Sequence, residues 1–245
     1  MTVAPPGTGA GAGFPACPLQ ERLAVMLTSP VEWTTIGTIM GYPSSPSGIH
    51  SVPFDVRRLA FDVARRADAM GILDGDTVTT VDGATVRRLL AQARKAGIAR
   101  MPVVDLGTLE APTQAELASL LTLLNAALER SPVPAHEWPS LARVFEPDQL
   151  AGLVNVSLSS LRRYQHGARH TPDEVSERLH FLALVVADLA GAYNDIGIRR
   201  WFERPRVLLG GKRPAALLVG NWDPEGPGAQ KVRHLAQSLV AVSAT

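Results

Sequence analysis

The stretch from Gln149 to Gly167 reads QLAGLVNVSLSSLRRYQHG. Two helices that cross through a tight turn need a small residue at their contact, a turn residue that tolerates the left-handed backbone region, and apolar residues beneath them. Ala151 supplies the small contact, and Asn155, four residues later, is the type of non-glycine residue that most readily accepts a positive φ. The apolar residues that would lock the pair from beneath are Leu150, Val154, Val156, Leu161 and Tyr164. The pattern predicts a helix-turn-helix.

The second helix of this pair is expected to carry its polar residues outward. Ser157 is a good N-cap, and the helix should run from Leu158 to about Gln165 before Gly167 ends it. The segment from Ser157 to His170 holds three Arg, two His and no acid. A recognition helix presents its N-terminal residues to base edges, and its basic residues reach guanine or phosphate. The residues we expect to contact double-stranded DNA are Ser157, Ser159, Ser160, Arg162, Arg163, His166 and Arg169. The alternative is that Arg162 and Arg163 are simply solvated on an ordinary helical hairpin.

Length and composition limit what else the chain can be. Its 245 residues suffice for one large domain or two to three small ones. The formal net charge is +1, so a nucleic-acid partner has to be met by a local basic patch. The single cysteine, Cys17, allows no internal disulfide and no zinc site built on several thiolates, and it favours a reducing, cytoplasmic setting. Trp33 to Phe54, the longest run without charge, contains Pro and Gly, so we expect no membrane span.

Composition changes along the chain predict a mainly α, multi-helix protein with four segments. The first 18 residues hold four Pro, four Gly and no charge, as is typical of a flexible tail. Turn signals flank a β-branched run over Asp74–Gly83, where a short β-hairpin or a lone strand can form. The segments are a tail (1–18), an N-terminal α(+β) domain of unknown role (19–110), a helical domain with the helix-turn-helix (113–193) and a small helical C-terminal domain (194–245).

Several further helices follow from apolar periodicity and from capping residues. We expect helices at Leu19–Leu27 and Thr85–Lys95, and one at Gln114–Arg130 that begins with a Thr113–Glu116 capping box. Phe54–Met70 and Pro172 to about Tyr193 are predicted as amphipathic helices. The first of these two should lie on the surface, with arginines largely opposite its apolar stripe. These arginines are Arg57, Arg58, Arg65 and Arg66.

A second basic cluster lies near the C-terminus. Six cations face one acid, Glu203, over residues 199–213, a local charge of +5. The six are Arg199, Arg200, Arg204, Arg206, Lys212 and Arg213. Such a patch can contact phosphates beside the DNA site or an acidic partner surface, or it can be a solvated face. Trp201 and Phe202, within the cluster, are expected to pack inward as core anchors. Leu208 and Leu209 are expected to form an apolar link to the helix that follows.

The C-terminal part resembles the toxin-binding domain of the Xre/MbcA/ParS antitoxins. The residues that carry the resemblance are Trp201-Phe202, Pro205, Leu209, Gly211, Pro214 and Leu217-Leu218. With the helix-turn-helix immediately upstream, it covers about 105 residues, from Leu141 to the C-terminus. It implies an all-helical homodimer that binds operator DNA and holds a toxin, of the RES-domain or ribonuclease type, through its C-terminal region. Phe202 stands where Leu is more usual, Asn221–Gly228 is a turn-rich insertion, and the first 110 residues or so have no counterpart in typical members.

No catalytic, metal or cofactor motif stands out. His166 and His170 are separated by Gly167, no Gly-rich stretch has the form of a phosphate loop, and no nucleophile lies near a base at a recognisable spacing. We therefore expect a non-enzymatic, sequence-specific DNA-binding regulator that represses its own operon and neutralises a cognate toxin. One alternative is a stand-alone transcription factor whose N-terminal region senses a ligand or adds DNA contacts. The other is an interaction module that mainly occludes a toxin.

Overall fold

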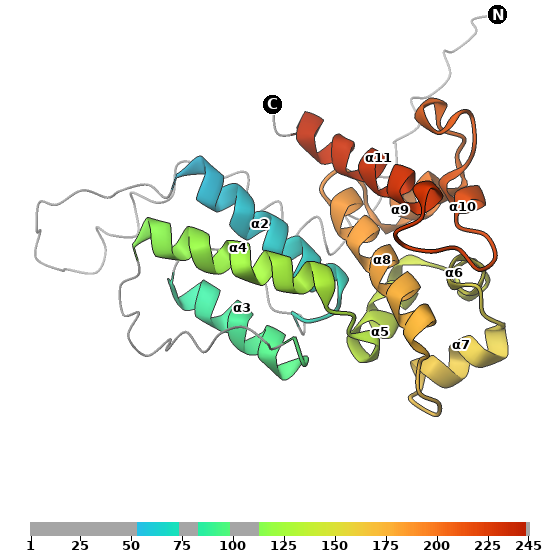
Figure 1. Cartoon of the computed structure of the whole chain (residues 1–245), viewed down its shortest axis with the longest axis horizontal. Coiled ribbons are helices and arrows are strands. Elements are labelled where there is room, and N and C mark those ends of the chain that lie inside the picture. The colour runs from blue at the N-terminus through green and yellow to red at the C-terminus, as the bar shows by residue number, and fades with distance from the viewer. Residues whose placement is uncertain (1–52, 74–82, 99–112, 244–245) are drawn as a thin grey trace, which may run out of the picture.

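The computed structural model describes residues 53–73, 83–98 and 113–243 (Figure 1). Within those ranges the chain forms ten α-helices and one short 3-10 helix, and no strand, so the expectation of a mainly helical protein is confirmed. The tail expected at 1–18, the helix at Leu19–Leu27 and all but the last residue of the Asp74–Gly83 hairpin lie outside the described residues.

The helices fall into two groups in Figure 1, with α2, α3 and α4 on one side of the molecule and α5 to α11 on the other. The bounds are α2 Phe54–Ala69, α3 Gly83–Lys95, α4 Gln114–Arg130, α5 Pro134–Val144, α6 Pro147–Val154, α7 Leu158–Gln165, α8 Asp173–Ala190, α9 Asp195–Glu203, the 3-10 helix η4 Val207–Leu209, α10 Pro214–Leu217 and α11 Pro227–Ser243. The capping box expected at the start of α4 is confirmed, since the Glu116 amide donates to Thr113 Oγ1 and the Thr113 amide to Glu116 Oε2.

Helix α8 is the central helix, and the expectation that it is amphipathic is wrong. From Val175 to its end only Glu177 remains exposed. The helix packs against α2, α5, α6, α9 and α11, so neighbours cover it on every side. A helix that is apolar nearly all round is stable only in such a buried position.

Helix α2 is also more deeply buried than its pattern predicted. Arg57 and Arg58 are exposed as expected, but Arg65 is buried. Its guanidinium pairs with Asp62 and donates to the carbonyl of Ala187 in α8 at 3.2 Å. Because α2 packs against both α4 and α8, part of its polar side is covered, and the prediction of a surface helix is wrong for that part.

One apolar core joins the N-terminal and C-terminal helices. It runs from Val56 in α2 to Ala236 in α11, and so continues across the boundaries expected near residues 110 and 193. A charged network accompanies it: Arg233 of α11 donates to Asp188 of α8 at 3.2 Å and to Glu129 of α4 at 2.8 Å. Arg66 of α2 reaches the same Glu129 oxygen at 2.8 Å. Burial raises the pKa of Asp188, against the lowering effect of Arg233.

Helix length and hydropathy give a limited result on membranes. In the described part of the chain, no single helix is long and apolar enough to cross a bilayer. Only α8 and α9 taken together reach the necessary length and hydropathy, and they are bent by 115° at their junction.

Candidate nucleic-acid interface

Helices α6 and α7 are joined by a tight turn of three residues, Asn155 to Ser157. Asn155 has φ 56° and ψ 55°, and it is the only non-glycine residue with a positive φ in the described ranges. The Val156 amide donates to the Ala151 carbonyl at 2.9 Å, which closes the end of α6. The left-handed conformation expected at Asn155 is confirmed.

The N-terminus of α7 is capped by a cluster of hydroxyls. Ser157 Oγ accepts from the Ser160 amide at 3.2 Å, so the expected N-cap is confirmed, as are the bounds of the helix. The same oxygen lies 3.0 Å from both Ser159 Oγ and Ser160 Oγ. Gly167, with φ 66°, follows the last turn. The three hydroxyls are thus held together at the end of the helix whose backbone amides point outward.

The inner face of α7 is locked to α5. Tyr164 stacks on Trp138 with the ring centroids 5.9 Å apart, and Trp138 Nε1 donates to Thr171 Oγ1 at 3.0 Å. Both ends of the segment after α7 are therefore fixed relative to α5. Of the residues expected beneath the pair, four are buried and one, Val156, is half-buried; the four are Leu150, Val154, Leu161 and Tyr164.

The outer face of α7 is basic and open. Arg162, Arg163, His166 and Arg169 are exposed, as are Ser157 and Ser159, whereas Ser160 is half-buried. The Arg169 guanidinium lies 5.8 Å from the centre of the Tyr164 ring. Among the described residues, no carboxylate pairs with Arg162 or Arg163. In Figure 1, α7 lies at the lower edge of the molecule, where a duplex can approach it. The structure brings all seven predicted DNA-contact residues onto this one surface.

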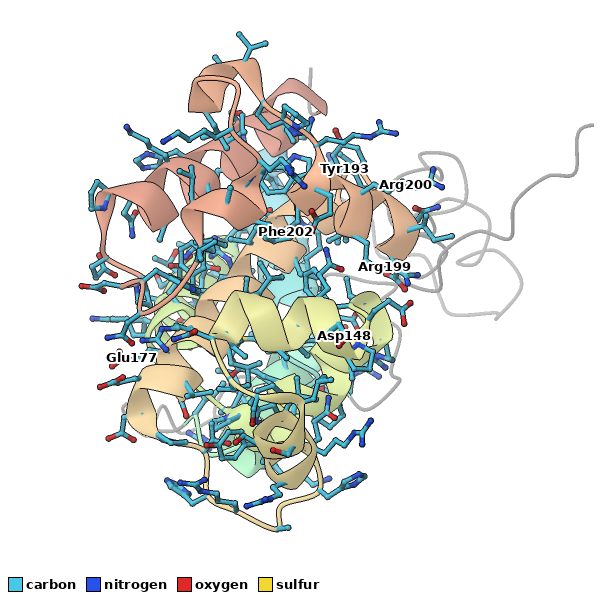
Figure 2. All side chains as sticks on the ribbon, turned by 90° about the vertical axis from the view of Figure 1, so that its right-hand side faces the viewer. Asp148, Glu177, Tyr193, Arg199, Arg200 and Phe202 are labelled. Atoms are coloured by element: carbon cyan, nitrogen blue, oxygen red, sulfur yellow. The ribbon has the colours of Figure 1, made fainter. Side chains whose placement is uncertain are left out.

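The second predicted site, the six cations near the C-terminus, is less open than its charge implied. Arg199 pairs with Glu146, and Arg213 lies 3.6 Å from Glu203. Arg206 is half-buried, with its guanidinium 5.2 Å from the centre of the Trp201 ring. The other three, Arg200, Arg204 and Lys212, are exposed. Arg199 and Arg200 lie on the same side of the molecule in Figure 2. Half of the cluster is therefore already engaged within the chain.

Sequence reasoning missed two exposed apolar residues inside that cluster. Of the expected apolar link, Leu209 is indeed buried. Val207 and Leu208, however, are 93% and 78% exposed. The signal was present in the two glycines that follow, Gly210 and Gly211, because both take a positive φ and turn the chain back.

Trp222, in the turn-rich insertion, was missed as well. Its Nε1 donates to the carbonyl of Leu153 in the last turn of α6 at 2.8 Å. Its ring meets Phe181 of α8 edge to face at 5.2 Å, and its own carbonyl accepts from Arg178 at 2.9 Å. This residue therefore attaches the C-terminal segment to the end of α6. A tryptophan in a polar turn was the only hint in the sequence.

A buried acid and a histidine connect α5 to α8 behind the basic face. Glu137 Oε1 lies 2.6 Å from His180 Nδ1, and His180 Nε2 lies 3.1 Å from the Glu129 carbonyl oxygen. Burial raises the pKa of Glu137, while the contact with His180 lowers it. A single proton shared between the two groups keeps the pair neutral. Within the described ranges, no group of three or more metal-ligating side chains occurs.

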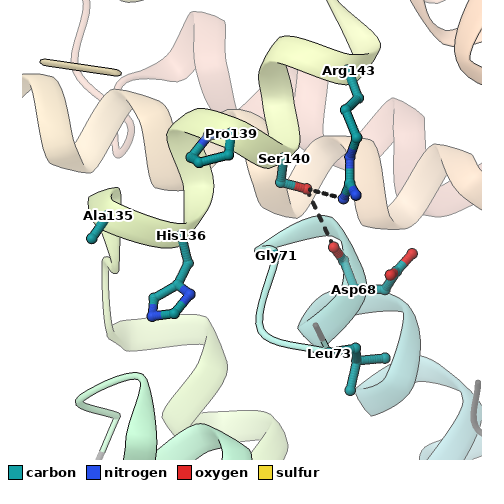
Figure 3. Close-up of a pocket in the computed structure, with 8 residues that line it drawn as sticks. All are labelled: Asp68, Gly71, Leu73, Ala135, His136, Pro139, Ser140 and Arg143. Atoms are coloured by element: carbon teal, nitrogen blue, oxygen red, sulfur yellow. Dashed lines mark hydrogen bonds between the residues drawn. The ribbon is translucent and has the colours of Figure 1, made fainter. Parts of the chain in front are cut away.

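A small pocket of about 240 Å³ lies where the end of α2 meets α5 (Figure 3). Ser140 Oγ donates to the Asp68 carbonyl at 3.3 Å and accepts from Arg143 at 3.1 Å, so its hydroxyl holds the two helices together. Gly71, with φ 74°, lies so close to α5 that a Cβ there would be 2.5 Å from the His136 carbonyl. These contacts are those of a tight joint between two helices.

Comparison of the chain with family models, with curated proteins and with solved structures found no match.

Proposed function

We propose that the protein is a sequence-specific DNA-binding transcriptional regulator in which α6 and α7 form the helix-turn-helix. The observation that carries the proposal is the outer face of α7. It presents two arginines without a carboxylate partner in the described structure, on a helix fixed by the Asn155 turn and by the Tyr164–Trp138 stack. Rigid presentation of unpaired guanidinium groups favours DNA, because a loosely held or ion-paired arginine gains less on binding.

Each polar residue of α7 has a role in this proposal. Ser159 and Ser160 lie at the N-terminal end, which approaches base edges when such a helix enters the major groove. Arg162 and Arg163 reach guanine edges or phosphates. Ser157, His166 and Arg169 flank the helix and contact the phosphate backbone, which sets position more than sequence. As a homodimer, the protein would read half-sites about 34 Å apart or a multiple of that distance.

The proposal extends to an antitoxin that represses its own operon and neutralises a toxin of the RES-domain or ribonuclease type. The support is the resemblance of the C-terminal residues, together with an exposed apolar pair beside exposed cations in the same region. Such a surface favours a protein partner over a purely solvated face.

The test is a mobility-shift assay with the full chain, on its own upstream DNA and on unrelated DNA of equal length. Arg162→Ala/Arg163→Ala should weaken binding to the upstream DNA at least tenfold. It should also reduce the slope of log affinity against log salt by about 0.9 for each phosphate that the variant no longer neutralises. The matched control is Arg57→Ala/Arg58→Ala, which removes a tandem pair of exposed arginines from α2, in the other group of helices, and should leave affinity unchanged.

Equal losses of affinity in the two double variants would mean that DNA is held by general charge and not by α7. No preference for the upstream DNA in the wild-type protein would remove the regulatory proposal altogether.

A further inference from the structure

The loop of residues 206–212 holds two apolar side chains out in solvent. Val207 and Leu208 are 93% and 78% exposed, whereas the next residue, Leu209, is 7% exposed. Single exposed apolar residues are common on protein surfaces. Two adjacent ones at the tip of a loop are a different matter, because a well-packed partner would gain most from burying them together.

The 206–212 loop is closed by its own backbone. The Arg206 amide donates to the Lys212 carbonyl, and the Gly211 amide donates to the Arg206 carbonyl, each at 3.0 Å. At the base, Leu209 enters the core and the Arg206 guanidinium lies over Trp201. A loop fixed in this way loses little conformational entropy when it binds, so more of the contact energy appears as affinity.

Cations surround the apolar tip. Arg204 and Lys212 are exposed, and Arg213 has only a long 3.6 Å contact with Glu203, with both side chains about half exposed. We propose that the 206–212 loop docks into a partner protein that offers an apolar pocket rimmed by carboxylates. A second copy of this chain fits less well, because the same cations would then face one another across the interface.

The loop lies far from α7. In Figures 1 and 2 the segment around α10 is at the upper end of the molecule and α7 is at the lower end. A partner on the loop therefore leaves the basic face of α7 open, and the protein can hold its partner and DNA at the same time. This last step rests on the proposed function, whereas the docking step does not.

The test uses the full chain and, as the probe, the product of the adjacent reading frame. The two are co-expressed, separated by gel filtration and then titrated. Val207→Ser/Leu208→Ser should raise the dissociation constant at least tenfold, and Arg204→Ala/Lys212→Ala should raise it at low salt but much less at high salt. The control Leu123→Ser changes another exposed apolar residue, on α4, and should leave binding within about twofold of wild type.

Three results would overturn the docking proposal: no complex with the wild-type chain, unchanged binding by the Val207/Leu208 variant, or conversion of a wild-type dimer to a monomer by that variant. Adding the upstream DNA separates the two proposals. A supershifted complex of DNA, chain and partner supports both, and a partner complex without DNA binding retains the docking step alone. DNA release on partner binding would contradict simultaneous binding.

Discussion

At the residue scale, the account depends most on Asn155. It is the one side chain in the described ranges, apart from glycine, that takes the left-handed conformation, and it sets the angle at which α7 leaves α6. Asparagine tolerates this conformation better than most residues do, whereas a β-branched side chain does so poorly.

We expect Asn155→Gly to fold with nearly wild-type stability and Asn155→Val to lose about 1–2 kcal/mol, because only the latter adds steric strain at φ 56°. Urea unfolding of the two variants gives the difference. If valine were tolerated as well as glycine, the turn would not have the geometry described above.

Local signals were read well from the sequence, and distant ones were not. The Asn155 turn, the Ser157 cap and the Thr113–Glu116 box each depend on residues within four positions, so their chemistry is visible in a short window. Arg65 was misplaced because what covers it, the Ala187 carbonyl, is 122 positions away. No window of one helix contains that information.

At the element scale, the end of α6 is held from outside the helix pair. Trp222 donates to the Leu153 carbonyl at 2.8 Å, one of the carbonyls that the last turn of a helix leaves unsatisfied. Phe181 and Arg178 of α8 hold the tryptophan in place. The C-terminal segment therefore contributes to the rigidity of the turn before α7.

Trp222→Phe should lower the free energy of unfolding by about 1–3 kcal/mol, because it leaves the Leu153 carbonyl buried without its donor. Hydrogen exchange should also rise at the Asn155 and Val156 amides, which donate to carbonyls of the last turn of α6. Unchanged stability and unchanged exchange in this variant would show that the bond does not support the helix end.

The helices themselves were predictable, but their environments were less so. The bounds of α4 and α7 match the expectation because caps and periodicity define them locally. The environment of α8 depends on five neighbouring helices, and the exposure of Val207 and Leu208 depends on which residue of the loop enters the core. Apolar character alone does not separate those outcomes.

At the scale of the whole molecule, charged contacts connect helices from both groups. Arg233 of α11 neutralises Asp188 of α8 and shares Glu129 of α4 with Arg66 of α2. Asp188 has a raised pKa because of its burial, and the nearby guanidinium groups oppose that rise. Its charge is tolerated only while those partners remain.

Arg233→Ala should therefore destabilise the protein by roughly 3 kcal/mol at neutral pH. Removing the arginine raises the folded-state pKa of Asp188 further above its ordinary 3.8. A raised carboxyl pKa favours the folded state in acid, and this benefit is lost as pH rises through the folded pKa. Urea titrations from pH 4 to 8 should show the deficit growing with pH. Lys231→Ala, an exposed cation on the same helix, should show almost none.

The central claim is that α7 enters the major groove of the protein's own upstream DNA. The most direct measurement attaches a photo-crosslinker at Ser159→Cys in a Cys17→Ser background, which leaves a single thiol. The control is Ser119→Cys, on α4, in the other group of helices. We predict crosslinks to bases at a defined position from residue 159 and none from residue 119. Equal crosslinking from both positions, or crosslinks from residue 119 alone, would contradict the account.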